Sequence, residues 1–187
     1  MALSVEGYGL LPVVEVPPAL LSAFSCGKPH LDEFLCQAAQ FHRSRLGLTS
    51  VVFHRDFGGV IGYFTLANDA LPLTTSEQYE FGVETALKAY PAVKLGRLAV
   101  STELQGQGVG RHVMGLVHGE ILESLSLSAA RLIIVDADND PPVVQFYRNL
   151  GYQDSLWAEA QAKNHGPSRR NPAEPSTIKM VRDVLSP

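Results

Sequence analysis

The chain has 187 residues, of which 45% are hydrophobic and 18% charged, enough apolar material for one compact core. A formal net charge of −4 argues against general electrostatic binding of nucleic acid. The sequence has no apolar run of about eighteen residues and no basic-then-apolar leader. We therefore expect a single domain over residues 1–187, located in the cytoplasm and not inserted in a membrane.

The first half of the chain reads as strands and helices separated by turn residues. A stretch rich in Pro and Gly at 3–16 is expected to hold a first strand, and apolar residues at helical spacing predict a helix over 29–45. Three further segments are predicted: strands at 49–54 and 60–67 joined by a hairpin through 56–59, and a helical or irregular stretch at 77–90.

Cysteine and histidine usage gives no sign of a metal or redox centre. Cys26 and Cys36 lie outside any C-x-x-C spacing and are expected to be free thiols. The six histidines show no ligand spacing, so no metal site is predicted.

A glycine-rich turn between a strand and a helix is the most informative feature of the chain. A strand is predicted at 95–101, and apolar residues at helical spacing predict a helix that runs to about Ser126. The first N–H groups of a helix lack intrahelical partners, and glycines let an anion approach them. The residues expected to bind a phosphate there are Gln105, Gly106, Gln107, Gly108, Val109, Gly110 and Arg111.

The spacing of these glycines limits which classes of phosphate-containing ligand the turn could bind. A P-loop would need Gly-Lys-Ser/Thr, but Gly110 is followed by Arg111 and His112, and no G-x-G-x-x-G dinucleotide fingerprint is present. The remaining pattern, Gln105-x-x-Gly108-x-Gly110, resembles the coenzyme A pyrophosphate loop of the GNAT superfamily of N-acetyltransferases.

A second segment, about thirty residues on, is similar to another hallmark of that family. Residues 131–138 have the continuous apolar run of a buried strand. A helix is then predicted after Asn139, with a proline in its first turn, Phe146-Tyr147 inside it and Gly151 at its end. Val143 and Val144 stand where the family more often has a small residue.

The resemblance implies an α/β fold with a mixed central sheet, splayed between two parallel strands at 95–101 and 131–137, and helices on both faces. It also implies acetyl-CoA as cofactor and a transferase that acetylates a primary amine. Phe146 and the backbone groups of Leu98, Ala99 and Val100 are then assigned to the cofactor, and the Val100 N–H is the expected oxyanion donor.

Tyr147 and Asn139 each have two readings. Tyr147 matches the family's general acid, with a core aromatic as the alternative. Asn139 is read as the N-cap of its helix, as a partner of the pantetheine amide, or as both.

A general base is not evident. No carboxylate lies in 94–100, and Glu84 and Glu103 are not obviously placed. An α-amine, with a pKa of about 7.7–8.0, loses its proton more readily than lysine, so an α-amino acceptor is favoured. Arg97 is either a solvated strand residue or a contact to cofactor or acceptor.

The N-terminal half is similar to one branch of the family, the GNAT toxins of bacterial toxin–antitoxin pairs. The similar segments are Phe24-x-Cys26-Gly27, Leu31-x-x-Phe34-Leu35, the basic run 42–45, and residues 62–66 and 95–100. This resemblance implies aminoacyl-tRNA as the amine acceptor and a DNA-binding antitoxin as a partner, and a homodimer is a further expectation.

The substrate and its binding residues stay open between several readings. Arg43 and Arg45 are either a solvated helix end or substrate contacts, and Lys163, Arg169 and Arg170 form a second basic cluster. The alternatives are a small-molecule or protein N-terminal acetyltransferase, or a GNAT-like binding module without catalysis. Unlike most such toxins, the chain is acidic, and it has a predicted long loop at 158–175 before a last strand at 176–184.

Overall fold

The computed structural model describes residues 3–4, 6–124, 129–165 and 175–186. The chain divides into two compact units, each built from two separate segments. The first unit comprises Met1–Ala67 and Leu95–Ser124, and the second comprises Asn68–Lys94 and Leu125–Pro187. The expectation of a single domain over all 187 residues therefore stays a prediction.

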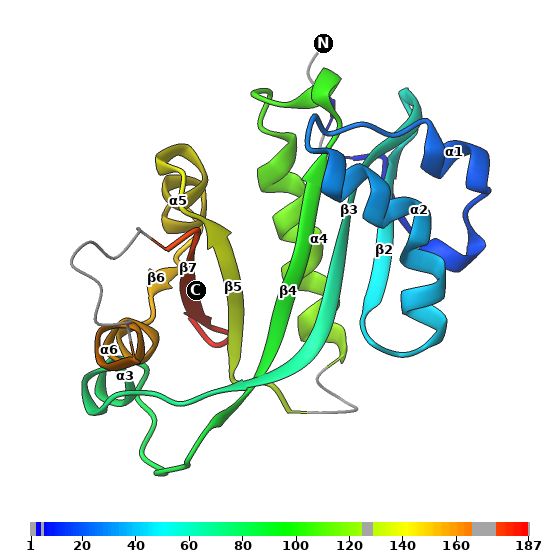
Figure 1. The fold of residues 1–187 in the computed structure, drawn as a ribbon. Helices are drawn as coiled ribbons and strands as arrows, with labels where there is room; N and C mark the ends of the chain where they lie inside the picture. The colour runs from blue at the N-terminus through cyan, green and yellow to red at the C-terminus, as the bar shows by residue number, and fades with distance from the viewer. Residues whose placement is uncertain (1–2, 5, 125–128, 166–174, 187) are drawn as a thin grey trace. The chain divides into compact units, whose positions relative to one another are not determined.

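The first unit contains four neighbouring strands (Figure 1). They follow the order β1-β2-β3-β4, and both β1–β2 and β2–β3 pair antiparallel. The strands are β1 (Tyr8–Pro12), β2 (Leu48–His54), β3 (Phe57–Leu71), which continues into the second unit, and the end of β4 (Tyr90–Val100). The hairpin between β2 and β3 turns earlier than predicted, because the Asp56 N–H donates to His54 Nδ1 at 3.1 Å and His54 pairs with Phe57.

Helices cover both faces of these strands (Figure 1). On one face, Leu35 and Ala38 pack in a buried cluster with Val51, Tyr63 and Ala99 from three strands, while α4 lies on the other face. The helical elements are η1 (Val13–Glu15), α1 (Pro18–Ser22), α2 (Pro29–Arg43), η2 (Thr102–Leu104) and α4 (Val109–Ser124). Helix α1 was not predicted, because five residues are too few to show a helical period.

The second unit contains the start of β4 and three further strands in the order β4-β5-β7-β6, with β5 parallel to β4 (Figure 1). Strand β7 pairs antiparallel with both β5 and β6. The elements are α3 (Thr75–Glu80), β5 (Leu132–Asp138), α5 (Pro141–Arg148), β6 (Gln153–Asp154), α6 (Leu156–His165) and β7 (Thr177–Asp183). The predicted mixed α/β sheet with parallel neighbours is thus confirmed, while the splay between them stays a prediction.

Residues 158–165 were wrongly predicted as part of a long loop, because they belong to α6. The loop prediction rested on Gly, Pro and Arg residues that begin at 166, whereas 157–163 contain good helix formers. The buried Glu77 also fixes the start of α6, since its Oε1 accepts the Leu156 N–H at 2.8 Å. Residues 166–174 lie outside the described residues.

Two other boundaries differ from the predictions. Of the ambiguous stretch 77–90, only 77–80 is helical, as the end of α3, whose start has a reciprocal capping box between Thr74 and Glu77. Strand β4 begins at Tyr90, five residues before the predicted start, and the end predicted for α4 near Ser126 lies outside the described residues.

Candidate active site

The glycine turn has the geometry of an anion cradle. Strand β4 ends at Val100, and α4 begins at Val109 after two glycines with left-handed backbones, Gly106 (φ 73°) and Gly108 (φ 82°). A Cβ atom at either glycine would meet nothing within 4 Å, so the space beside these peptides is open. Successive N–H groups in such a turn, followed by a helix N-terminus, form a concave site for phosphate. The residues present therefore fit the pyrophosphate of coenzyme A.

The Gln105 side chain forms hydrogen bonds with two neighbouring segments. Its side-chain amide Nε2 donates to the carbonyl oxygens of Cys26 and Val100, each at 2.9 Å. The side chain therefore ties the loop to its surroundings, with both N–H groups of its amide donated to carbonyl oxygens of the protein.

Hydrogen bonds hold both the C=O and the N–H of the Val100–Ser101 peptide at the end of β4. The Ser101 N–H donates to Ile61 O at 2.9 Å, while Val100 O accepts from Gln105. Ala99 points into the buried cluster beneath α2, and its neighbours Leu98 and Val100 are half-buried. Gly62 permits this packing, because a Cβ there would lie 2.6 Å from Ala99 O.

Arg97 makes a defined contact. Its guanidinium carbon lies 4.8 Å from the centroid of the Phe34 ring, and its Nη1 donates to Gly96 O at 2.8 Å. The cation–π contact orients the exposed side chain over α2. Neither reading of Arg97 from the sequence anticipated this contact, because Phe34 lies about sixty residues away in the chain.

A turn before α2 was missed by the sequence analysis. Asp32 Oδ1 accepts the Cys26 N–H at 2.8 Å, and Asp32 Oδ2 accepts the Ser25 hydroxyl at 2.9 Å. Burial alone would raise the pKa of Asp32, but these hydrogen bonds and one with the Cys26 thiol lower it below its ordinary value. The only available signal was an acidic residue in the first turn of a helix, which is common.

Both cysteines are free, as predicted, but they differ in environment. Cys26 is buried, and burial followed by the hydrogen bond with Asp32 raises the pKa of its thiol to about 11, so it is a poor nucleophile. Cys36 is exposed on α2. Within the described part of the chain, no three His, Cys, Asp or Glu side chains are grouped to hold a metal ion.

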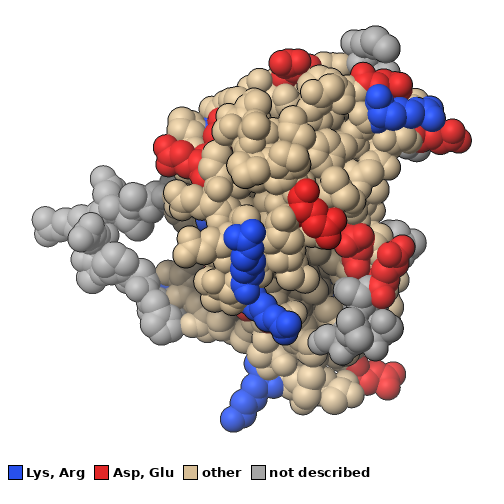
Figure 2. All heavy atoms as spheres, turned by 90° about the vertical axis from the view of Figure 1, so that its right-hand side faces the viewer, with Lys and Arg blue, Asp and Glu red and all other residues tan. Residues whose placement is uncertain are grey.

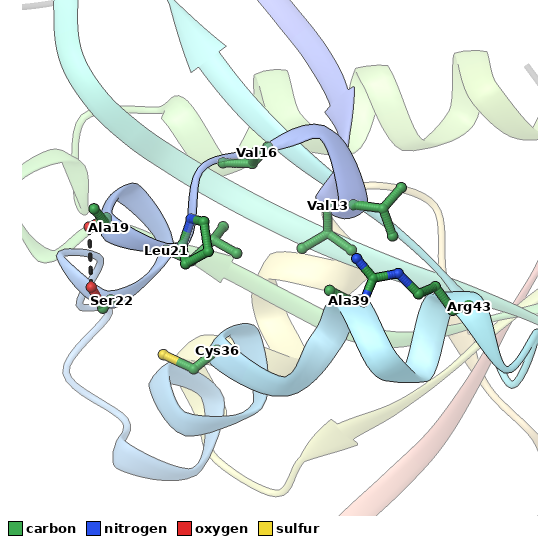
Figure 3. A pocket seen from close by; sticks show the side chains of 10 residues that line it. Val13, Val16, Ala19, Leu21, Ser22, Cys36, Ala39 and Arg43 are labelled. Carbon is green, nitrogen blue, oxygen red and sulfur yellow. Dashed lines mark hydrogen bonds between the residues drawn. The ribbon is translucent and has the colours of Figure 1, made fainter.

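Arg43 and Arg45 lie at the end of α2. Arg43 reaches over Ala39 toward Val13, at one end of a hollow of about 430 Å³ (Figure 3). Arg45 adopts a left-handed backbone (φ 54°), and its N–H donates to His42 O at 3.0 Å to end the helix. Figure 2 faces the side that carries α1 and α2, where both basic and acidic side chains stand in a largely uncharged surface.

In the second unit, Tyr147 lies on α5 among aromatic rings. Only 6% of the residue is exposed, and its ring meets Phe146 and Tyr152 edge-on, with centroids 5.2 Å and 5.5 Å away. Burial, followed by the charge of Asp138, raises the pKa of Tyr147 above its ordinary value. Its hydroxyl therefore keeps its proton throughout the neutral range.

Asn139 does not cap α5, which corrects one of its two readings. The N-cap is Asp140, because Pro141 and Pro142 occupy the first helical positions and the residue before a proline is extended. The Asn139 side chain donates instead to Pro175 O at 2.9 Å, and its backbone N–H donates to Ser176 O. Arg169 and Arg170 of the second basic cluster lie outside the described residues.

Comparisons with known proteins show the family and the fold of the chain. The sequence pattern of the acetyltransferase (GNAT) family matches residues 18–152. The tRNA-acetylating toxin of Mycobacterium tuberculosis is 28% identical over 120 residues, which cover 64% of this chain and 70% of the toxin.

Solved structures of toxins share the fold. AtaT complexed with acetyl-methionyl-tRNAfMet has a TM-score of 0.71 at 20% identity, with 94% of each chain covered. A tyrosine-to-phenylalanine mutant of KacT has a TM-score of 0.69 at 17% identity, with 96% of each chain covered. None of the helices described for this chain is long and apolar enough to cross a membrane. The chain belongs to the GNAT family of acetyltransferases and is an N-acetyltransferase with acetyl-CoA as its donor.

Proposed function

We propose that this acetyltransferase modifies the α-amine of aminoacyl-tRNA, acts as a toxin, and is restrained by a DNA-binding antitoxin. The main support is the 28% identity to a tRNA-acetylating toxin over 120 residues. The similarity of 24–35 and 42–45 to the opening of such toxins adds to it. The solved structure of AtaTR bound with AcCoA, like those of AtaT and KacT, is similar to this chain in fold, with a TM-score of 0.64 at 20% identity.

The cofactor site proposed here has two parts. The backbone N–H groups of 105–111 hold the pyrophosphate, an assignment supported by the left-handed glycines and the open space beside them. The backbone of Leu98, Ala99 and Val100 is proposed to pair with the pantetheine arm. In the second unit, Asn139 and Phe146 are proposed as cofactor contacts from the family resemblance. When bound, acetyl-CoA supplies an acetyl group activated as a thioester.

The chemical roles proposed for the protein follow from protonation. Tyr147 Oη holds a proton at neutral pH, because burial raises its pKa, and can donate it to a departing thiolate. The Val100 N–H donates to the oxygen on which charge develops. An α-amine with a pKa of about 7.7–8.0 is substantially uncharged at neutral pH, so this acceptor needs little help from a base.

The acceptor site requires a local basic surface, since the chain as a whole carries a charge of −4. Arg43 and Arg45 at the exposed end of α2 are proposed as phosphate contacts. Arg97 is proposed as a further acceptor contact, because Phe34 orients its guanidinium. We also propose that the 187 residues form one domain, located in the cytoplasm. We further propose that the protein forms a homodimer, and light scattering would test this by measuring its mass in solution.

The direct test incubates the protein with acetyl-labelled cofactor and total charged tRNA, with small amines and peptide N-termini in parallel. We expect label on charged tRNA and little on the other acceptors. Label confined to small amines or peptides would support the generic acetyltransferase, and no transfer at all would support a binding module.

A charge reversal separates acceptor binding from cofactor binding. The double variant Arg43→Glu and Arg45→Glu should lose tRNA acetylation but keep cofactor affinity, because phosphate repels the new carboxylates. Arg55→Glu is the matched control, since Arg55 is also exposed in the first unit but lies in the β2–β3 turn. Equal loss in the control would contradict the proposed contact.

A further inference from the structure

The turn Ser25–Gly27 contacts the connection between β4 and α4 in three places. Ser25 O accepts hydrogen bonds from Thr102, at 3.0 Å from the N–H and 3.4 Å from the hydroxyl. Cys26 O accepts from Gln105 Nε2 at 2.9 Å. The turn is therefore bound to both ends of the short segment that leads into the cofactor loop, although it lies almost eighty residues earlier in the chain.

Asp32 determines the shape of this turn. Its two carboxylate oxygens accept from the Cys26 N–H and the Ser25 hydroxyl, at 2.8 Å and 2.9 Å. Gly27 closes the turn with a left-handed backbone (φ 80°), and a Cβ there would come within 3.3 Å of Thr102 Cγ2. With both oxygens of Asp32 occupied, the Ser25 and Cys26 carbonyls point at Thr102 and Gln105.

Gln105 passes this constraint on to the loop. Because its amide also donates to Val100 O, the residue that precedes Gly106 is fixed to the end of β4 and to the turn together. Glycines are the most flexible residues, so Gly106 and Gly108 need external support to keep their N–H groups aligned. Aligned donors bind an anion well only when they are ordered beforehand.

We propose that Asp32 is a positioning residue for the cofactor: through the turn Ser25–Gly27 and the Gln105 amide, it holds the loop 105–111 in its anion-binding shape. This inference rests on the proposed role of that loop in binding the pyrophosphate. Asp32 touches no ligand in this scheme. It links the start of α2 to the affinity for coenzyme A.

The first test is a calorimetric titration of coenzyme A into the full chain. Asp32→Ala and the near-isosteric Gln105→Met should each weaken the affinity for coenzyme A about 10-fold. This is the size expected for losing the hydrogen bonds of a charged carboxylate, or the two hydrogen bonds that one amide donates. The double variant should weaken it about 10- to 20-fold and not about 100-fold, because both changes break one connection. Multiplicative losses would overturn the proposal.

Two further variants serve as controls, one for the loss of a carboxylate and one for the loss of N–H donors. Glu33→Ala removes a carboxylate from the next, exposed position of α2 and should leave the affinity unchanged. Gln105→Arg retains N–H donors and should restore most of the affinity lost in Gln105→Met. If Asp32→Ala does not fold, Ser25→Ala removes one bond to the same carboxylate and should cost about 3-fold.

Hydrogen exchange on the cofactor-free protein gives a readout independent of cofactor binding. The Arg111 amide, which donates to Gly108 O at 3.0 Å, should exchange about 10-fold faster in Asp32→Ala and Gln105→Met than in Glu33→Ala, because a loop with less support opens more often. Unchanged exchange would overturn the positioning role. Faster exchange with unchanged affinity for coenzyme A would instead overturn the cofactor role proposed for the loop.

Discussion

The glycine loop at 105–110 and the helix α5 that carries Tyr147 use their residues in opposite ways. The loop presents backbone N–H groups beside open space, on left-handed backbones that L side chains rarely adopt. Tyr147 offers one side-chain hydroxyl from a nearly buried ring, and burial raises its pKa. Acetyl transfer therefore makes two different demands on the protein. The loop suits binding of a phosphate, and the tyrosine suits a hydroxyl that stays protonated at neutral pH.

The largest expected effect is the loss of turnover when the Tyr147 hydroxyl is removed. Tyr147→Phe keeps the ring and its contacts with Phe146 and Tyr152 but removes the hydroxyl. Steady-state kinetics should show turnover lowered by about 10²–10⁴-fold, the usual range for a general acid. Turnover near the wild-type value in the folded variant would make Tyr147 a core aromatic.

The second prediction concerns the loop. Gly108→Glu places a side chain on a left-handed backbone (φ 82°) and a negative charge where a phosphate is proposed to bind. Calorimetry should show affinity for coenzyme A reduced by at least about 100-fold, because steric block and repulsion act together. Gly115→Ala, in the helix that follows, is the control and should bind normally, since its Cβ would meet nothing within 4 Å.

A third, smaller effect is expected at an ion-pair cluster in the second unit. Asp136 lies 2.6 Å from Lys94 Nζ and 2.7 Å from Lys179 Nζ. Burial alone would raise the pKa of Asp136, but hydrogen bonds from Lys179 and Lys94 lower it. Asp136→Asn should reduce the free energy of unfolding by about 1–2 kcal/mol at neutral pH, because two ammonium groups lose their counterion.

The pH dependence of this cluster follows from the direction of the shift. A lowered pKa means that the ionised carboxylate stabilises the folded state above its unfolded pKa of about 3.9, and that this stabilisation is lost as pH falls through the folded value. The difference between wild type and Asp136→Asn should therefore vanish in acid denaturation curves. The exposed pair Glu159 and Lys163, 3.7 Å apart, is the comparison, where Glu159→Gln should cost at most about 0.5 kcal/mol.

The smallest effect is expected at the end of α2. Arg45 has the left-handed backbone that favours glycine, so Arg45→Gly should raise the free energy of unfolding by about 1 kcal/mol in denaturant titration. If Arg45 contacts tRNA as proposed, the same variant should lose acetylation of tRNA while gaining stability. A gain in both would remove Arg45 from the acceptor site.

Local patterns explain what the sequence predicted well. The glycine spacing at 106–110 identified a turn into a helix, and Gly151 (φ 82°) ends the α5 region as expected. These features depend on residues close together in the chain, and the backbone demands a particular residue type at each. The turn into α4 could therefore be predicted from the sequence alone.

Contacts between distant segments explain what was missed. Asp32 is connected to the loop through the turn Ser25–Gly27 and Gln105, and Arg97 is ordered by Phe34; no local pattern reveals either contact. Helix α6 was hidden by the Gly and Pro residues that follow it, although its own residues favour helix. Side-chain partners that are distant in the chain, not local patterns, decide the positions of Asp32 and Arg97.

Titrating coenzyme A into Gly108→Glu and Tyr147→Phe side by side tests the division between the two regions most directly. We predict that Gly108→Glu no longer binds measurably, while Tyr147→Phe binds as the wild type does and still transfers acetyl groups far more slowly. Normal binding by a folded Gly108→Glu variant, or lost binding in Tyr147→Phe, would contradict the account.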